Sequence, residues 1–161
     1  LMNKKHIEEL YKQIEQNSCN SIFALSLPML LINKYLHNSQ ESFYKTRYDL
    51  LHSDIDVLAA LYFANDKHTL TPTELYDATI FSSGGMTKVL KKLQERELIT
   101  KQNSKNDKRS QEVSLSQKGE ELIVECIELS SKKLSDNFHI LKEKEQKELQ
   151  KILKKLLFSM I

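Results

Sequence analysis

The sequence predicts a mainly α-helical fold (α+β) that carries one small β-hairpin. Only three glycines and two prolines interrupt 161 residues, so long helices joined by short connections are expected. Apolar side chains recur at helical spacing along most of the chain, and the pattern becomes alternating only between residues 98 and 116. With 40% hydrophobic and 29% charged residues, 1–161 has the composition of a single globular domain.

The first part of the chain predicts three helices. Residues 4–16 place apolar side chains three and four positions apart. A more apolar helix follows, and Pro28 is expected to kink or end it because proline lacks the N–H of the helical ladder. The polar residues 37–42 predict a turn. The third helix is expected to start with Ser53 as its N-cap and Asp56 three residues further on.

The centre of the chain predicts a short helix, a turn and a basic helix. Thr71 as N-cap, Pro72 at the first helical position and Glu74 at the third form a capping-box pattern. This helix is predicted to end before Phe81. The Ser-Ser-Gly-Gly stretch at 82–85 then precedes a second helix with one apolar and one charged face. The apolar positions of that second helix are Met86, Val89, Leu90 and Leu93.

A hairpin and two long helices complete the prediction. Residues 98–104 and 111–116 alternate as short strands around a polar, charged loop. The stretches 117–134 and 143–161 are amphipathic helices. The last helix carries an apolar stripe of Leu149, Ile152, Leu153, Leu156, Leu157 and Met160. Because this stripe lies outside the compact middle of the chain, it favours packing between subunits.

The order helix, turn, helix and hairpin is that of a winged helix-turn-helix, and its charge agrees. Eight basic and three acidic residues between positions 86 and 110 give this segment a net charge of +5, against +2 for the whole chain. A basic stripe on a nearly neutral protein is the electrostatic pattern of a surface that binds a polyanion.

The start of the basic helix predicts contacts in the major groove of DNA. Small residues there let the backbone approach DNA, and free N–H groups at a helix N-terminus favour phosphate. Hydroxyl groups and lysines can reach base edges and backbone phosphates. The predicted contact residues are Ser82, Ser83, Gly84, Thr87, Lys88, Lys91 and Lys92.

The hairpin loop predicts a second contact. Its candidate residues are Lys105, Asp107, Lys108 and Arg109. Two residues apart in an extended loop, Asp107 and Arg109 can pair, and the carboxylate would then hold the guanidinium toward the minor groove, where negative potential attracts arginine.

Five motifs in register resemble the MarR family, the multiple-antibiotic-resistance type of transcriptional regulator. They are Glu74-Leu75, SSGGMT at 82–87, Leu93 with Leu98-Ile99, Asp107-Lys108-Arg109, and the leucine, small hydroxyl and glycine pattern of 115–119. The resemblance covers about 50 residues closely, and the flanking helices agree in number and length. One departure is Glu97, which stands where the family usually has a left-handed glycine at the end of the basic helix.

The resemblance implies a homodimeric repressor on a pseudo-palindromic, double-stranded operator. The dimerisation helices would be 4–45 and 116–161, and the DNA-binding lobe would be 53–115. Family members are released from DNA by a small ligand or by cysteine oxidation. Several segments are most similar to the urate-responsive branch, but the chain lacks the tryptophan of that branch.

Two kinds of switch therefore stay open. A cleft for a small anionic or aromatic effector is predicted at His37, Arg47, Tyr48, His52 and Asp56, although surface and capping roles would also explain these residues. A redox switch would use Cys19 or Cys126, for which the alternative is two small buried apolar side chains.

Other functional classes find little support. Phosphate-binding and nucleophile motifs of enzymes are missing from the sequence, as are metal-binding spacings of His or Cys and apolar runs of membrane-span length. We therefore expect a cytoplasmic protein that is not an enzyme and has no cofactor, metal or membrane partner. A winged-helix module that binds protein without an inducer is the alternative.

Overall fold

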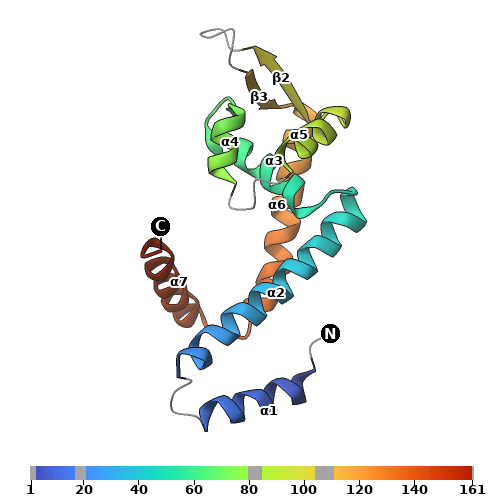
Figure 1. Ribbon diagram of the computed structural model, residues 1–161. Helices are drawn as coiled ribbons and strands as arrows, with labels where there is room; N and C mark the ends of the chain where they lie inside the picture. The colour runs from blue at the N-terminus through green and yellow to red at the C-terminus, as the bar shows by residue number, and fades with distance from the viewer. Residues whose placement is uncertain (1–2, 17–20, 80–84, 104–110, 161) are drawn as a thin grey trace. The chain divides into compact units, whose positions relative to one another are not determined.

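A computed structural model describes residues 3–16, 21–79, 85–103 and 111–160, and it places seven helices and three short strands in them (Figure 1). The chain forms two compact units, Leu1–Asp49 and Leu50–Ile161. The first unit holds helices α1 and α2, and the second holds the other elements. Among the described residues, every helix is too short or too polar to cross a membrane.

The first unit differs from its prediction in the length of its second helix. Helix α1 spans Lys4–Glu15 and α2 spans Ser21–Tyr48. The predicted turn over 37–42 is wrong, because α2 continues through it, and Pro28 does not end the helix. Beyond the polar stretch Tyr44 is buried. Burial of an apolar face outweighs the weak helix propensity of the His, Asn and Ser residues before it.

Helix α3 starts two residues earlier than predicted, because a different side chain caps it. The helix spans His52–Ala64, and Leu51 occupies the N-cap position. The Asp54 carboxylate, at the third helical position, accepts the N–H of Leu51 at 2.7 Å. Ser53 is therefore inside the helix and not its cap. Sequence reasoning favoured serine for its hydroxyl and missed a cap provided by an acid three residues downstream.

The helix pair that follows agrees with its prediction. Helix α4 spans Pro72–Ala78, and α5 spans Met86–Glu95. The capping box of α4 is confirmed: the Thr71 N–H donates to Glu74 Oε2 at 2.7 Å, and the Glu74 N–H donates back to Thr71 Oγ1 at 3.2 Å. These reciprocal bonds satisfy two N–H groups that a helix start leaves without helical partners.

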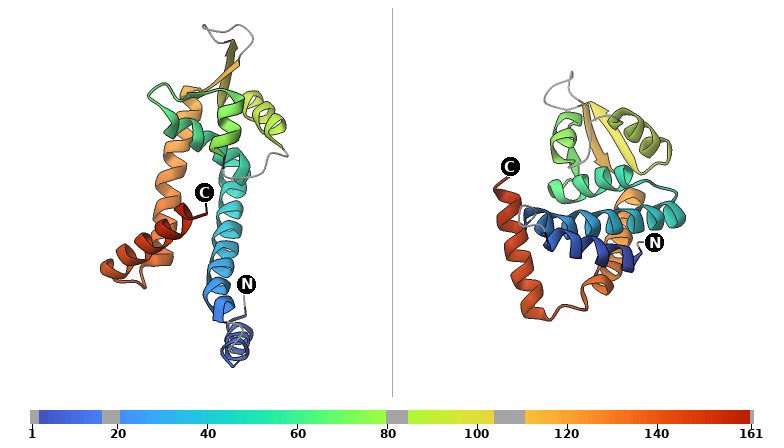
Figure 2. Two further views of the ribbon diagram at one scale, coloured as in Figure 1. Left: turned by 60° about the vertical axis from the view of Figure 1, so that its left-hand side comes forward. Right: turned by 60° about the horizontal axis from the view of Figure 1, so that its bottom comes forward.

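The hairpin is confirmed and gains a third strand. Strands β2, Ile99–Asn103, and β3, Gln111–Leu115, pair antiparallel. The two-residue strand β1, Thr69–Leu70, adds to the other edge of β3, giving the order β1-β3-β2. Figure 2 shows β2 and β3 between α4 and α5 in its right-hand view. The sequence did not predict β1, because two residues are too few to show a period.

Two long helices follow the sheet. Helix α6 spans Gln117–Phe138 and α7 spans Glu143–Phe158, as predicted in type and order. A short turn joins them, in which the Gln146 side-chain amide donates to the carbonyls of Phe138 and Leu141 at 3.2 and 2.9 Å.

The core of the second unit lies where α3, α4, α5 and α6 meet the sheet. The core side chains that are at most 2% exposed include Leu58, Leu61, Leu75, Leu93, Leu98, Ile99, Val113 and Ile123. Burial of each such side chain contributes roughly 1.5–3 kcal/mol. This core makes α3 and the sheet a firm support for α5.

Candidate nucleic-acid interface

Among the residues that the structure describes, none caps the N-terminal end of α5 with its side chain. Gly85 occupies the N-cap position, and no side chain there accepts an N–H of the first turn. A Cβ atom at Gly85 would meet nothing within 4 Å, so the fold itself does not require glycine at this position. Within the described residues, no side chain takes up the first-turn N–H groups at the positive end of the helix dipole, where an anion is favoured. Ser82, Ser83 and Gly84 lie outside the described residues.

The outer face of α5 carries the predicted contact residues that the structure describes. Thr87, Lys88 and Lys91 are exposed on it. Lys91 Nζ lies 3.8 Å from Glu95 Oε1, one turn along, and both side chains remain more than half exposed. Such a pair is weak in water and holds Lys91 only loosely. The face therefore presents hydroxyl and ammonium groups beside the uncapped helix end.

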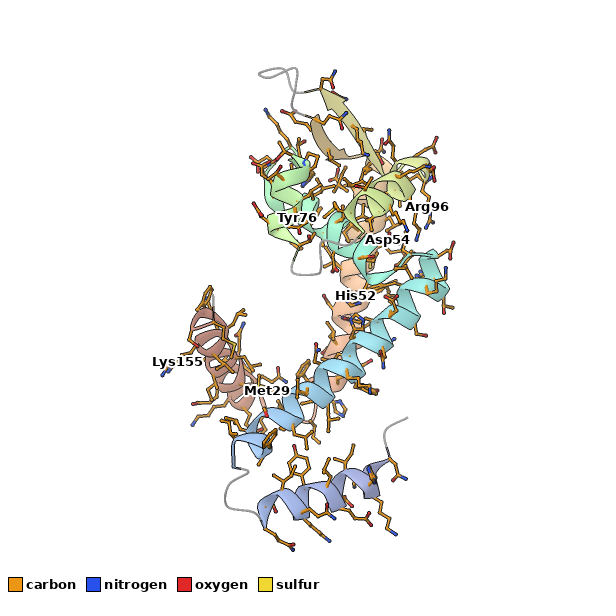
Figure 3. All side chains as sticks on the ribbon, viewed as in Figure 1. Met29, His52, Asp54, Tyr76, Arg96 and Lys155 are labelled. Carbon is orange, nitrogen blue, oxygen red and sulfur yellow. The ribbon has the colours of Figure 1, made fainter. Side chains whose placement is uncertain are left out.

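Lys92 differs from the other lysines of α5 because its ammonium group pairs inside the unit. Its Nζ lies 2.5 Å from Asp54 Oδ2 on α3, and the Asp54 side chain is only 2% exposed. Figure 3 labels Asp54 there, together with Arg96 at the end of α5. Sequence reasoning grouped Lys92 with the DNA-facing residues and missed this partner, because the two residues are 38 positions apart and leave no local signal.

The C-terminal end of α5 is closed by a left-handed residue. Glu97 has φ 60°, and its N–H donates to the Gln94 carbonyl at 2.9 Å. The next N–H, that of Leu98, donates to the Leu93 carbonyl at 2.9 Å. These two bonds form a Schellman motif, and the buried Leu93 and Leu98 supply the apolar residues that accompany it. Glu97 thus adopts the left-handed backbone expected from the family's glycine.

The start of α6 locks this helix end in place. Ser116 Oγ donates to the Glu97 carbonyl at 2.6 Å and accepts the Gly119 N–H at 3.0 Å. A Cβ atom at Gly119 would lie 2.0 Å from the Leu98 carbonyl oxygen. Lys118 Nζ donates to the Arg96 carbonyl at 2.9 Å. The Leu115–Gly119 pattern therefore has a physical explanation: it packs the start of α6 directly against the turn after α5.

The base of the predicted wing is held by β1. The Leu115 N–H donates to the His68 carbonyl at 3.1 Å, and Thr69 Oγ1 lies 2.8 Å from Ser114 Oγ. The His68 ring stacks on Tyr62, with ring centroids 5.1 Å apart. These contacts tie β3 to the end of α3. The described part of the hairpin ends at the pair formed by Asn103 and Gln111. The predicted wing residues lie outside the described residues; they are Lys105, Asp107, Lys108 and Arg109.

The five predicted cleft residues are divided between the two units. His37, Arg47 and Tyr48 lie on α2, where the Arg47 guanidinium stands 5.7 Å from the centroid of the Tyr48 ring. His52 and Asp56 lie in the first turns of α3. Asp56 also lines a mostly apolar cavity of about 440 Å³ in the second unit, beside Phe63, Leu70 and Ala78.

Of the two predicted redox residues, the structure describes one. Cys126 is buried in α6, where loss of solvation raises the pKa of its thiol. Its Sγ lies 3.9 Å from Ser130 Oγ. A buried thiol with a raised pKa forms little reactive thiolate. Cys19 lies outside the described residues.

Comparisons with known proteins identify the family. The model of the transcriptional regulator SarA/Rot family matches residues 40–126, which is more than half of the chain. No curated protein matches the sequence.

Solved structures show the same fold. A mutant of MarR from E. coli complexed with operator DNA is 24% identical, with a TM-score of 0.71 over 88% of this chain and 99% of that one. The S. aureus MepR–DNA complex is 19% identical, with a TM-score of 0.72 over 85% and 98%. AbsC from Streptomyces coelicolor, a MarR family regulator, is 18% identical, with a TM-score of 0.74 over 89% and 95%. The predicted MarR-type winged helix is confirmed, and the chain belongs to the SarA/Rot family of transcriptional regulators.

Proposed function

We propose that this regulator binds double-stranded DNA sequence-specifically as a homodimer, with the N-terminal end of α5 in the major groove. The observation that carries the proposal is the uncapped start of α5 at Gly85, flanked by the exposed Thr87, Lys88 and Lys91. N–H groups and a positive dipole end attract phosphate, lysines neutralise backbone charge, and a hydroxyl can reach a base edge.

The hairpin loop would supply the second contact. In this proposal Lys105 and Lys108 lie along the phosphate backbone, and Arg109 enters the minor groove with Asp107 orienting its guanidinium. Ser82, Ser83 and Gly84 would join α5 on the major-groove side. Support comes from the fold of the two relatives whose structures contain DNA, the MarR mutant and MepR.

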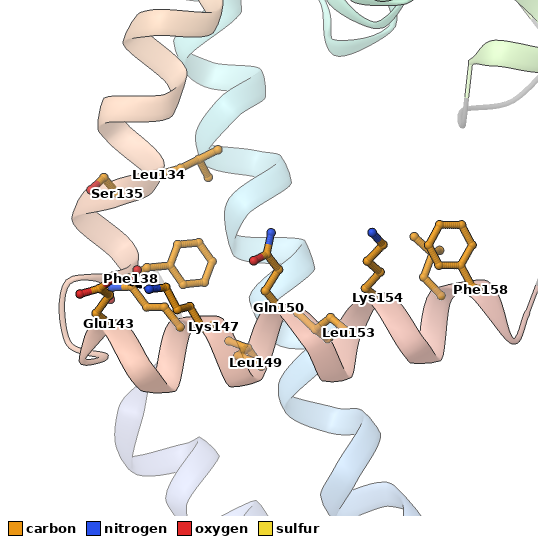
Figure 4. A pocket seen from close by; sticks show the side chains of 12 residues that line it. Leu134, Ser135, Phe138, Glu143, Lys147, Leu149, Gln150, Leu153, Lys154 and Phe158 are labelled. Atoms are coloured by element: carbon orange, nitrogen blue, oxygen red, sulfur yellow. Dashed lines mark hydrogen bonds and ion pairs between the residues drawn. The ribbon is translucent and has the colours of Figure 1, made fainter.

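An apolar groove in the second unit supports the dimer. Figure 4 shows the groove between the end of α6 and helix α7, with a volume of about 870 Å³. The groove is lined by Leu134, Phe138, Leu149, Leu153, Leu157 and Phe158, among other residues. Leu157 and Phe158 are 56% and 62% exposed, which is unusual for large apolar side chains on one helix. A second copy of the chain would cover them.

Helix α2 in the first unit also supports the dimer. Its N-terminal half exposes apolar side chains on several sides, among them Ile22, Phe23, Leu25 and Leu30. A helix that is apolar all round is normally buried all round. In a symmetric dimer each copy covers the same surface of the other.

Repression and its release are the finer part of the proposal. A repressor would leave its operator when a small anionic or aromatic molecule binds, or when a cysteine is oxidised. Burial of Cys126 disfavours that residue as the sensor. Gel shifts with and without an oxidant or added phenolic acids separate the two routes, since only one treatment should release the DNA.

Enrichment of duplexes from a random library by the intact protein tests the function. We expect a pseudo-palindrome whose half-sites lie about 10 base pairs apart, because two α5 helices of a dimer reach successive major-groove turns. Sedimentation of the complex should show two chains per duplex. Recovery of no common sequence would contradict specific DNA binding, and one chain per duplex would contradict the dimer.

A further inference from the structure

The ion pair between Asp54 and Lys92 differs in kind from the surface pairs of this chain. Lys91–Glu95 and Lys147–Glu143 join residues one turn apart, with all four side chains more than half exposed. Asp54 and Lys92 join two helices, and their side chains are 2% and 34% exposed. Removing one partner of a buried pair leaves an uncompensated charge, so this contact strongly favours a single arrangement of α3 and α5.

Asp54 is held firmly from its own side. It stands in the first turn of α3, where its oxygen accepts the Leu51 N–H at 2.7 Å and the helix dipole favours its negative charge. One turn further along α3, Leu58 is fully buried. The carboxylate is therefore a fixed point against which α5 can be placed.

Through Lys92, the fixed position of Asp54 determines how the outer face of α5 is oriented. It stands one turn after Lys88 on the same helix, so the angle at which Lys92 meets Asp54 also sets the direction in which Lys88 projects. Leu90 and Leu93 hold α5 on the core by apolar contact, which has no preferred direction. A charge-assisted hydrogen bond is directional, so it can fix the rotation of the helix about its axis.

We propose that Asp54 is a positioning residue for DNA recognition, which acts through Lys92 and sets the rotation of α5. Lys92 then serves inside the protein and does not contact phosphate. This inference rests on the proposed function. It predicts that Asp54 affects DNA affinity, although Asp54 is far along the chain from every predicted DNA-contact residue.

A set of variants of the full chain separates this role from phosphate contact. Asp54→Asn keeps the shape and an acceptor for the Leu51 N–H but removes the charge. Lys92→Met removes the ammonium group at similar length, and Lys92→Arg keeps a cation. Lys91→Met is the matched control on the exposed face of the same helix. Affinity is measured against salt on the duplex enriched by the wild-type protein and on a scrambled duplex, and folding is measured separately by urea denaturation.

The positioning role predicts a distinct pattern. Asp54→Asn and Lys92→Met each weaken binding to the enriched duplex about tenfold, with little effect on the scrambled one. The double variant is no weaker than the worse single variant, because both remove the same contact. Lys92→Met leaves the slope of log affinity against log salt unchanged, whereas Lys91→Met lowers it by about 1.8, because each chain of the dimer loses one phosphate contact. Lys92→Arg stays within about threefold of wild type.

The wild-type protein provides a measurement that needs no substitution. Lysine acetylation, mapped by mass spectrometry with and without the enriched duplex, should show Lys88 and Lys91 reactive in the free protein and protected by DNA. Lys92 should react slowly in both states. This result decides the matter if Asp54→Asn or Lys92→Met fails to fold.

The contrary outcomes are distinct. If Asp54→Asn binds like wild type, the positioning role is wrong. If Lys92→Met lowers the salt slope as much as Lys91→Met, Lys92 is a phosphate contact and the positioning role is again wrong. Strong acetylation of Lys92 that DNA suppresses leads to the same conclusion. A purely structural role would lower stability in urea while the folded variants kept wild-type affinity. Failure of the wild-type protein to bind any duplex would instead overturn the proposed function and this inference with it.

Discussion

The two ends of helix α5 are built in opposite ways. At the N-terminal end, Gly85 has no side-chain cap and no neighbour within 4 Å of a potential Cβ. At the C-terminal end, a Schellman motif, the Ser116 hydroxyl and the Lys118 ammonium group satisfy successive carbonyls. The C-terminal end is thus satisfied by the protein itself, whereas no described side chain caps the N-terminal end, which we propose to face DNA.

Two glycines illustrate the same difference. Gly119 is required by the fold, since any side chain would collide with the Leu98 carbonyl. Gly85 has a φ of −153°, which other residues also adopt, and it has free space around it. A glycine that the fold does not need is a reasonable place for close approach by another molecule.

Gly119→Ala tests the C-terminal end of α5 and should have the largest effect on stability. The new Cβ would lie 2.0 Å from a backbone oxygen that cannot move without disturbing the turn after α5. We expect a loss of about 3 kcal/mol in the free energy of unfolding, measured with urea. The matched control is Gly85→Ala, which should change stability far less. Equal losses at the two sites would contradict the contrast between the ends.

Gly85→Asp tests the N-terminal end of α5. There, stability and DNA binding should change in opposite directions. An acidic N-cap stabilises a helix start, by about 0.5 kcal/mol here. The same charge faces phosphate, so affinity for DNA should fall roughly tenfold. Gly85→Asn, with the same shape and no charge, should weaken binding less. Undiminished affinity of the aspartate variant would place DNA elsewhere.

Glu97→Gly examines the strain in the helix end and should stabilise the protein. Glu97 has φ 60°, a conformation that costs a residue with a side chain about 1 kcal/mol more than glycine. The exposed contact between Lys118 and Glu97, at 3.5 Å, contributes little against this cost. We expect a higher thermal midpoint. A lower midpoint would mean that the Glu97 side chain stabilises the turn in a way that its contacts do not indicate.

Loss of the capping box of α4 should give the smallest effect on stability, and this effect should depend on pH. Hydrogen bonds from the Thr71 N–H and then from its hydroxyl lower the pKa of Glu74 below its ordinary 4.5. A carboxylate whose pKa is lowered by folding stabilises the folded state above its unfolded pKa, and the contribution is lost as pH falls through the folded pKa. The thermal midpoints of wild type and Glu74→Gln should therefore differ at neutral pH and converge below pH 4.5. A difference that persists in acid would exclude the carboxylate as its source.

The sequence predicted what depends on neighbours along the chain. The Thr71–Glu74 box and the alternating strands are patterns of four or five residues, and each was recognisable. The continuity of α2 was missed, because burial of Tyr44 overrides the local preference for a turn. The Asp54–Lys92 pair was missed because its partners meet only after folding. The family resemblance supplied the left-handed residue at position 97, which the propensity of glutamate argues against.

Photo-cross-linking of the wild-type protein to its enriched duplex, substituted with 5-iodouracil, tests most directly whether the open end of α5 meets DNA. The attached peptides can be identified by mass spectrometry. We predict attachment at residues 85–91 and in the loop 104–110, and none on α6 or α7. Attachment confined to α6 or α7, with the start of α5 unmodified, would contradict the assignment of this helix end to DNA.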